Sequence, residues 1–353
     1  MALALTEPTD TGLLWLRQVQ SEVEARLLEL LELPDEQGID PRWTDALLRT
    51  REYALRPAKR LRPALVAVGH GVGTGHAHVP EGLWTFAAAF ELLHTFLLIH
   101  DDVADCAERR RGSPALHRVL APGKLGEDLA VVMGDHLFAR SIEAMLGMGL
   151  PGAARAVRYY LGVCRHTAAG QYLDLDLTRA PLSEVTLFQT LRVAHLKTAR
   201  YGFVAPLVAG AMLAGAPRPL MDRLDRVGRY VGLAYQMRDD LLGLFGESQV
   251  AGKSSDGDFA QGKRTFPVLS AYTRAPPAIR AEMETLWSER PADPVALARA
   301  RTLVTAHGGV AATERLIERA SRSARRVLAS LPHGGGFRDL LDSLILTLSQ
   351  RRS

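Results

Sequence analysis

Residues 91–117 read ELLHTFLLIHDDVADCAERRRGSPALH, and this stretch decides the fold that the chain is expected to adopt. It begins as an apolar segment of helical character, because no glycine or proline occurs from Phe86 to Arg111. Three carboxylates follow in its middle, at Asp101, Asp102 and Asp105. Residues four apart share one face of a helix, so Asp101 and Asp105 should lie side by side, with Asp102 at the edge of the same stripe.

Carboxylates stacked in this way repel each other unless a cation lies between them. Hard oxygen ligands suit Mg²⁺, which keeps water molecules and takes substrate phosphates as its remaining ligands. Three arginines, residues 109–111, follow the acids directly, and the run Phe96–Ile99 before them has a core-like apolar character. A solvated acidic helix end is the ordinary explanation of such a cluster, but acids for metal beside arginines for phosphate indicate a diphosphate site.

A second acidic stretch, residues 232–265, reads GLAYQMRDDLLGLFGESQVAGKSSDGDFAQGKRT. Asp239 and Asp240 fall inside an expected helix, and Gln236 precedes them on the same face. Carboxylates inside an apolar helix are costly unless they are paired or bind metal, although a pair of surface aspartates is the alternative. If the two acidic helix faces oppose each other, several divalent ions can be held around one diphosphate.

The loop after this helix, residues 246–262, is rich in glycine and serine, carries Lys253 and is followed by Lys263. Such a loop is either a lid that closes over phosphates or a flexible connector. Other candidates are equally ambiguous when taken alone. Lys59 and Arg62 form either a solvated basic turn or part of a site, and His94, two turns before the first aspartate, is either a satisfied core residue or a ligand.

Apolar residues three and four positions apart predict helices along almost the whole chain, and no stretch alternates convincingly as a β-strand does. Proline and glycine separate these helices, for example at Pro151-Gly152 and Pro276-Pro277. We therefore expect an all-α protein with a flexible N-terminus, residues 1–11, and a single helical domain over residues 12–353. The expected helices cover residues 12–33, 43–55, 61–75, 82–105, 125–148, 152–177, 183–214, 218–246, 264–274, 278–288, 293–306, 309–331 and 337–350.

Composition limits the classes of function. The 353 residues are 47% hydrophobic, enough for a large core, and the formal net charge is only +4. No basic tract with interleaved aromatic residues indicates nucleic-acid binding. Two cysteines form no disulfide framework, and the N-terminus lacks the pattern of a signal peptide, so we expect a cytoplasmic protein. The uncharged run Tyr201–Pro217 is interrupted by Pro206 and is shorter than the roughly 20 residues of a membrane span, so no stable membrane insertion is expected.

The order and spacing of the motifs resemble those of the trans-isoprenyl diphosphate synthases (polyprenyl synthetases) over residues 50–275. The resemblance implies an all-helical bundle around a deep central cavity, usually in a homodimer. It implies a reaction that joins isopentenyl diphosphate to an allylic diphosphate. The matching motifs are KRLRP at 59–63, DDVAD at 101–105, RRG at 110–112, GDHLFAR at 134–140, GQYLD at 170–174, KTA at 197–199, QMRDD at 236–240, GK at 252–253 and GKRT at 262–265.

The resemblance also assigns roles. It implies up to three Mg²⁺ ions, bound by Asp101 and Asp105 with Asp102 in support, and by Asp239 with Asp240 beside it. Diphosphate ligands on the allylic side would be Arg110, Lys197 and Lys253, and Lys263 also counts as a substrate-binding residue. The isopentenyl diphosphate pocket would comprise Lys59, Arg62, His94 and Arg111. Thr198 and Gln236 would stabilise the developing allylic cation.

Product length follows a family rule on the residues before the first aspartate. Phe96 stands five positions before Asp101 and Leu97 four before, with no insertion in the motif, which resembles a geranylgeranyl (C20) synthase with Phe96 as the pocket floor. A helical wheel instead places Leu98 and His94 on the aspartate face and Phe96 near the opposite side of the helix. Farnesyl and C25 diphosphates are the alternative products. Gly243 replaces the third aspartate of the second motif, which leaves one metal-side contact open.

Two other kinds of protein fit part of the pattern. Residues 239–247, DDLLGLFGE, match the second metal motif of class I terpene cyclases, (N/D)D-x-x-(S/T/G)-x-x-x-E. A cyclase needs no isopentenyl site, however, and Lys59, Arg62 and the arginine pair 110–111 would supply one. A regulatory subunit of a heteromeric synthase tends to lose the aspartates, whereas this chain retains them.

Overall fold

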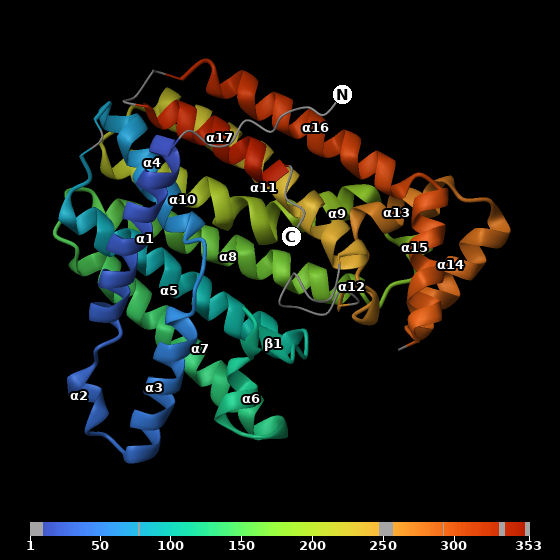
Figure 1. Cartoon of the computed structure of the whole chain (residues 1–353), viewed down its shortest axis with the longest axis horizontal. Coiled ribbons are helices and arrows are strands. Elements are labelled where there is room, and N and C mark those ends of the chain that lie inside the picture. Colours follow the sequence, from blue (N-terminus) through green and yellow to red (C-terminus); the bar gives the residue numbers. More distant parts are fainter. Residues whose placement is uncertain (1–9, 77, 247–256, 292, 332–335, 350–353) are drawn as a thin grey trace.

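The computed structural model describes residues 10–76, 78–246, 257–291, 293–331 and 336–349, and the described part is almost entirely helical (Figure 1). The first half contains one short hairpin, β1 (Arg109–Arg110) with β2 (Ser113–Pro114). Its helices are α1 (Asp10–Leu30), α2 (Pro34–Gln37), α3 (Pro41–Leu55), α4 (Leu61–Thr74), α5 (Glu81–Ala104), α6 (Leu116–Leu120), α7 (Gly123–Gly147) and α8 (Ala153–Leu177).

The second half is likewise helical over its described residues. Its elements are η1 (Leu182–Glu184), α9 (Leu187–Val193), the π-helix η2 (Ala194–Val204), α10 (Ala205–Leu213), α11 (Arg218–Phe245), α12 (Gly257–Ala260), α13 (Phe266–Arg274), α14 (Pro277–Glu289), α15 (Pro294–Ala306), α16 (Gly309–Leu328) and α17 (Phe337–Ser349). The expectation of an all-α fold is confirmed.

Helix α5 lies in the middle of the bundle, packed against α1, α4 and α7 (Figure 1). It is long and apolar enough to cross a membrane by length and composition, but 67% of its most apolar window is buried inside the protein. Phe86 and Phe90 are fully buried and stack toward Tyr160 of α8. The hydrophobic effect therefore fixes α5 as a core helix, and the aspartates stand at its C-terminal end.

Glycines allow α4 and α10 to approach each other closely. A Cβ on Gly69 of α4 would overlap the backbone of Leu207, and a Cβ on Gly210 of α10 would overlap the carbonyl oxygen of Val66. Each helix therefore presents a glycine to the backbone of the other. This contact keeps the start of α4, which carries Arg62, at a fixed distance from the helices that follow η2.

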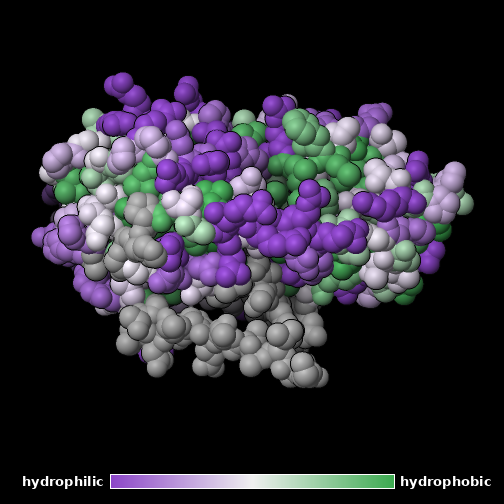
Figure 2. Space-filling view, turned by 90° about the horizontal axis from the view of Figure 1, so that it is seen from above, coloured by the Kyte–Doolittle hydropathy of each residue, from purple (hydrophilic) through white to green (hydrophobic). Residues whose placement is uncertain are grey.

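Helix α11 packs between η2 and α16, and α13, α14 and α15 form a smaller cluster at the end of the molecule (Figure 1). Helix α16 is amphipathic, because Ile317 and Ala320 are buried whereas Arg315, Arg319 and Arg322 are exposed. The side of the molecule on which α16 and α17 lie is accordingly hydrophilic over much of its surface (Figure 2).

Several boundaries differ from expectation. The helix expected over 183–214 is divided, because the hydrogen-bond register changes to that of a π-helix at Ala194 and back at Ala205, just before Pro206. The hairpin and the short helices α2, α6 and α12 were not expected, since their hydrophobic repeats are too short to detect. The division between residues 1–11 and 12–353 stays a prediction, because residues 1–9 lie outside the described part of the chain.

Candidate active site

The two outer aspartates of the first motif face lysines from other parts of the chain, one on η2 and one between α12 and α13. Asp101 accepts a hydrogen bond of 3.0 Å from Nε2 of Gln171 on α8, and one of its carboxylate oxygens lies 3.2 Å from Nζ of Lys197 on η2. Asp105, at the C-cap of α5, lies 3.2 Å from Nζ of Lys263. Helical spacing places both carboxylates at one end of α5, as expected, where the two lysines meet them.

Asp174 on α8 joins these two lysines. Its Oδ2 atom lies 2.7 Å from Nζ of Lys197 and 3.5 Å from Nζ of Lys263. Burial alone would raise the pKa of Asp174, but the two lysines outweigh it and the pKa falls below its ordinary value. Burial likewise opposes the charge of Lys197, yet Asp101 and Asp174 raise the pKa of Lys197. Asp174 and the two lysines are therefore charged at neutral pH, with the carboxylate between the two ammonium groups.

Asp102 has different surroundings from its neighbours. It is fully buried, the hydroxyl of Tyr53 donates to its Oδ2 at 2.7 Å, and Arg110 donates to its Oδ1 through Nε at 2.7 Å and also through Nη2. Both oxygens are thus engaged by protein donors. Asp102 was expected to contact metal and Arg110 to contact diphosphate, but in the structure they bind each other. This pairing supports a role for Asp102 in positioning Arg110.

The second aspartate pair also divides its tasks. Asp239 is exposed, whereas Asp240 is buried and accepts a hydrogen bond of 2.7 Å from Nε2 of Gln236. Thr198 of η2 donates to Oε1 of the same glutamine, so Thr198, Gln236 and Asp240 form one chain between η2 and α11. Burial raises the pKa of Asp240 to about 8. The hydrogen bond from Gln236 opposes this shift, and the carboxylates of Asp258, Asp239 and Asp174 each add a smaller contribution to it.

The contribution of Asp174 shows that α11 and the end of α5 border one site, because the same carboxylate binds the lysine that faces Asp101. Asp258 of α12 belongs there too. A Cβ on Gly243 would overlap the carboxylate of Asp258, so the missing side chain on α11 leaves the space that this acid fills. The spacing of residues contains no sign of this pairing, because Gly243 and Asp258 lie on two different helices.

A second group of polar residues lies between α4, α5 and η2. Nη2 of Arg62 donates to the hydroxyl of Tyr201 at 2.8 Å, and its guanidinium lies 4.8 Å from the centre of that ring. The same hydroxyl lies 3.2 Å from Nδ1 of His94. Burial, followed by nearby arginines, lowers the pKa of His94 well below its ordinary value, so this histidine is neutral. Arg62 and His94 are brought together as expected, and Tyr201 joins them.

Arg60 and Arg111, which flank this group, have left-handed backbones, with φ of 46° and 53°. A left-handed conformation costs a residue with a side chain about 1–2 kcal/mol. Both guanidinium groups contact the same buried carboxylate, that of Glu91 on α5. The charge of Arg111 is therefore paired with a protein carboxylate in this structure. Its expected contact with isopentenyl diphosphate remains a prediction.

Phe96 faces α7. Its ring lies 4.6 Å from that of His100 and 5.2 Å from that of Phe138, and Gly134 of α7 provides the room that the His100 ring occupies. Phe96 therefore points toward α7, away from the face of α5 that carries Asp101, as the helical wheel indicates. Leu97 is partly buried and packs against the core. Its role in product length stays a prediction.

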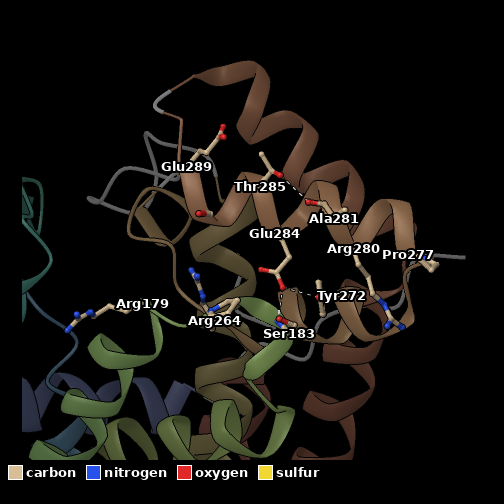
Figure 3. Close-up of a pocket in the computed structure, with 12 residues that line it drawn as sticks. Arg179, Ser183, Arg264, Tyr272, Pro277, Arg280, Ala281, Glu284, Thr285 and Glu289 are labelled. Atoms are coloured by element: carbon tan, nitrogen blue, oxygen red, sulfur yellow. Dashed lines mark hydrogen bonds between the residues drawn. The ribbon is translucent and has the colours of Figure 1, made fainter.

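A separate cavity of about 810 Å³ is lined by α13, α14 and residues 179–183 (Figure 3). It contains none of the predicted site residues. Arg264, the neighbour of Lys263, reaches it, but its Nε and Nη2 donate to the carbonyl oxygen of Ala180. The predicted site residues therefore lie at the acidic site and not at this cavity.

The acidic site suits a metal that arrives with its substrate. Among the residues that the structure describes, no three histidine, cysteine, aspartate or glutamate side chains gather closely enough to hold an ion. Mg²⁺ is normally held by one or two carboxylates together with water and substrate phosphates, so the oxygen donors of Asp101, Asp105 and Asp239 fit it. Lys253 and Glu247, both singled out in the sequence, lie outside the described residues.

Comparison with known proteins identifies the family. The model of the polyprenyl synthetase family matches residues 44–304, and the chain belongs to this family. It is 33% identical over 259 residues to the short chain isoprenyl diphosphate synthase of Methanothermobacter thermautotrophicus, a match that covers 72% of this chain and 76% of that one. It is 35% identical over 259 residues to a geranylgeranyl diphosphate synthase of Mycobacterium tuberculosis, covering 72% and 70%.

Solved structures show the same fold. The geranylgeranyl pyrophosphate synthase of Corynebacterium glutamicum, complexed with isoprenyl diphosphate and magnesium, has a TM-score of 0.86 at 28% identity, covering 95% of this chain and 99% of that one. Other relatives are named farnesyl diphosphate synthase and heptaprenyl diphosphate synthase component 2, and their matches span 59% and 63% of their own length. The protein is thus a trans-prenyl diphosphate synthase of the isoprenoid synthase fold, whereas the names of its relatives differ in product length.

Proposed function

We propose that this synthase depends on Mg²⁺ and condenses isopentenyl diphosphate with allylic diphosphates up to geranylgeranyl diphosphate. The observation that carries the proposal is the alternation of charge at the end of α5, where Asp101 and Asp105 face Lys197 and Lys263. A diphosphate with bound metal can exchange these contacts one for one, with lysine on phosphate oxygens and carboxylate on metal. Up to three ions, held by Asp101, Asp105 and Asp239, would neutralise the charge of the leaving diphosphate.

The residues of the chain then divide the work. Lys197 and Lys263 bind the allylic diphosphate as its C–O bond breaks. The oxygens of Thr198, which follows Lys197 on η2, and of Gln236 stabilise the positive allylic carbon that forms. Lys59, Arg62 and neutral His94 hold the second diphosphate, so that the isopentenyl double bond can attack that carbon. The proton then lost goes to the released diphosphate, so the proposal needs no side-chain base.

Product length is the finer part of the proposal. Phe96 at the α5–α7 contact, with Leu97 beside it and no insertion in the first motif, supports a C20 product. The direct test incubates purified protein with Mg²⁺, isopentenyl diphosphate and each of the C5, C10 and C15 primers, followed by chromatography of the products. A C20 product from all three primers is expected, and a product that stops at C15 or continues to C25 would refute this length.

The same assay separates the enzyme from a terpene cyclase. A cyclase releases a hydrocarbon or an alcohol from an allylic diphosphate alone, whereas a synthase requires isopentenyl diphosphate. The group formed by Arg62, His94 and Tyr201 favours the synthase, since a cyclase has no second diphosphate to bind.

We also propose a cytoplasmic homodimer. Both cysteines, Cys106 and Cys164, are free, which suits a reducing compartment. Helix α7 exposes Leu125, Leu129 and Val132 along one stripe, with exposed fractions of 60%, 40% and 54%, and a second copy would cover it. Sedimentation of the purified protein tests the proposal, and a monomer at micromolar concentration would contradict it.

A further inference from the structure

Glu91 contacts arginines from two separate chain segments, the start of α4 and the turn of the β1–β2 hairpin. Its side chain, on α5, is 2% exposed. Nη1 of Arg60 donates to its Oε1 at 2.7 Å, and Nη2 of Arg111 donates to the same oxygen at 3.3 Å. Both arginines also donate to the carbonyl oxygen of Arg56, at 3.2 Å and 3.3 Å, so the two segments meet at the end of α3 as well.

The two arginines share an unusual backbone conformation. Arg60 and Arg111 are two of only four non-glycine residues with positive φ in the described part of the chain. A residue with a side chain holds this conformation only when its surroundings determine it, and here the common determinant is the buried carboxylate. Arg60 follows Lys59 and starts α4, which carries Arg62, while Arg111 follows Arg110. The conformation of Arg60 therefore sets the directions of Lys59 and Arg62, and that of Arg111 sets the direction of its own side chain, which is itself a candidate for the isopentenyl diphosphate pocket.

We propose that Glu91 is a positioning residue for the binding of isopentenyl diphosphate. It fixes Arg60 in its left-handed conformation and so directs Lys59 and Arg62 toward the second diphosphate, and it holds Arg111 beside the same pocket. Glu91 itself does not touch substrate, because its carboxylate is covered by the two guanidinium groups. This inference rests on the proposed function, since it deepens the assignment of the same site.

The charge of Glu91 is required as well as its shape. One buried carboxylate faces two guanidinium groups, and the other carboxylate near Arg60, that of Glu24, is half-exposed and lies 3.7 Å away. Among the described residues the Oε2 atom of Glu91 is buried without a hydrogen-bond partner. A glutamine would remove the charge and would place an amide donor at that buried position. Glu91→Gln should therefore loosen both segments at once.

The test is the steady-state kinetics of Glu91→Gln, with isopentenyl diphosphate and the allylic primer varied separately. The KM for isopentenyl diphosphate should rise roughly ten- to hundredfold, because small misplacements of binding groups are expensive. The KM for the allylic primer and the kcat at saturation should change by no more than about threefold, since Asp102 holds Arg110 independently of Glu91 and the loss is one of ground-state positioning. Glu81→Gln is the matched control, because Glu81 lies on the same helix and pairs with Arg26 at an exposed position away from the site.

A second variant separates the side-chain contact from the backbone. Arg60→Gly accepts the left-handed conformation without strain but removes one arm of the contact, and it should also raise the KM for isopentenyl diphosphate. It decides the matter if Glu91→Gln does not fold. An unchanged KM in a folded Glu91→Gln or Arg60→Gly variant would overturn the inference, whereas a wild-type protein that makes no prenyl diphosphate would overturn the proposed function instead.

Discussion

Gly243 of α11 and the carboxylate of Asp258 on α12 lie so close together that no side chain fits between them. Gly243 occupies the position of the third aspartate in the second acidic motif. The acid absent from α11 is thus matched by an acid that packs against the same turn from another segment. Asp258 also raises the pKa of Asp240, so its charge is felt within the aspartate pair.

Gly243→Ala should therefore damage the site. The new methyl group would displace Asp258 and α12, which precedes Lys263, and turnover should fall at least roughly tenfold as these groups move out of position. The concentration of Mg²⁺ needed for half-maximal activity should rise in the same assay. Gly162→Ala is the control, because Gly162 lies in α8 with open space around it, and there alanine should stabilise the helix by about 0.5–1 kcal/mol without loss of activity. Equal behaviour of the two variants would contradict the packing argument.

The same substitution should mainly lower turnover at Asp101 and mainly lower stability at Asp102. Asp101→Asn removes a charge from the acidic site, so turnover should fall by about a thousandfold with the thermal midpoint nearly unchanged. Asp102→Asn leaves Arg110 buried without its carboxylate, which should lower the free energy of unfolding by about 3–5 kcal/mol. Thermal unfolding and product formation measured on both variants check the distinction. An Asp102→Asn protein as stable as the wild type would refute the positioning role.

The residues that the sequence could identify are those whose neighbours lie on the same helix. Asp101 and Asp105 follow from a four-residue spacing, and Gln236 with Asp240 from another, and the structure shows both relationships. Asp174 and Tyr201 could not be assigned contacts in this way, because their partners lie on other helices.

The π-helix η2 could not be predicted from the sequence either. It presents Lys197, Thr198 and Tyr201 at the site, yet a change of hydrogen-bond register leaves no trace in the spacing of apolar residues. The family resemblance pointed to Lys197 and Thr198 by their motif, whereas the pairing of Asp102 with Arg110 required the hairpin that carries the arginine.

His94 should make the stability of the protein depend on pH. Its pKa is well below the ordinary value in the folded state, so below about pH 6.5 the unfolded chain binds a proton that the folded chain does not. The contribution of His94 to the free energy of unfolding should therefore be fully present above this pH. Below it, the free energy of unfolding should fall by up to about 1.4 kcal/mol for each pH unit of acidification. Denaturant unfolding of wild type and His94→Gln at neutral and at mildly acidic pH measures the effect. The variant should lose less stability than the wild type, and parallel losses would show that His94 takes up a proton in the folded state.

Phe96→Ala should lengthen the products. The ring packs against His100 and Phe138 at the contact of α5 with α7, and its removal leaves space along α5 before the aspartates into which a longer chain can grow. The loss of packing should also lower the free energy of unfolding, by up to about 3 kcal/mol, because the ring is only partly buried. Chromatography of the products after incubation with isopentenyl diphosphate and a C15 primer gives the distribution. Phe188→Ala is the matched control, because that ring is 68% exposed on α9 and its removal should change neither length nor stability. If Phe96→Ala and Phe188→Ala give the same products as the wild type, Phe96 is not the floor, and the residues that limit the chain lie on the other face of α5, which carries Asp101.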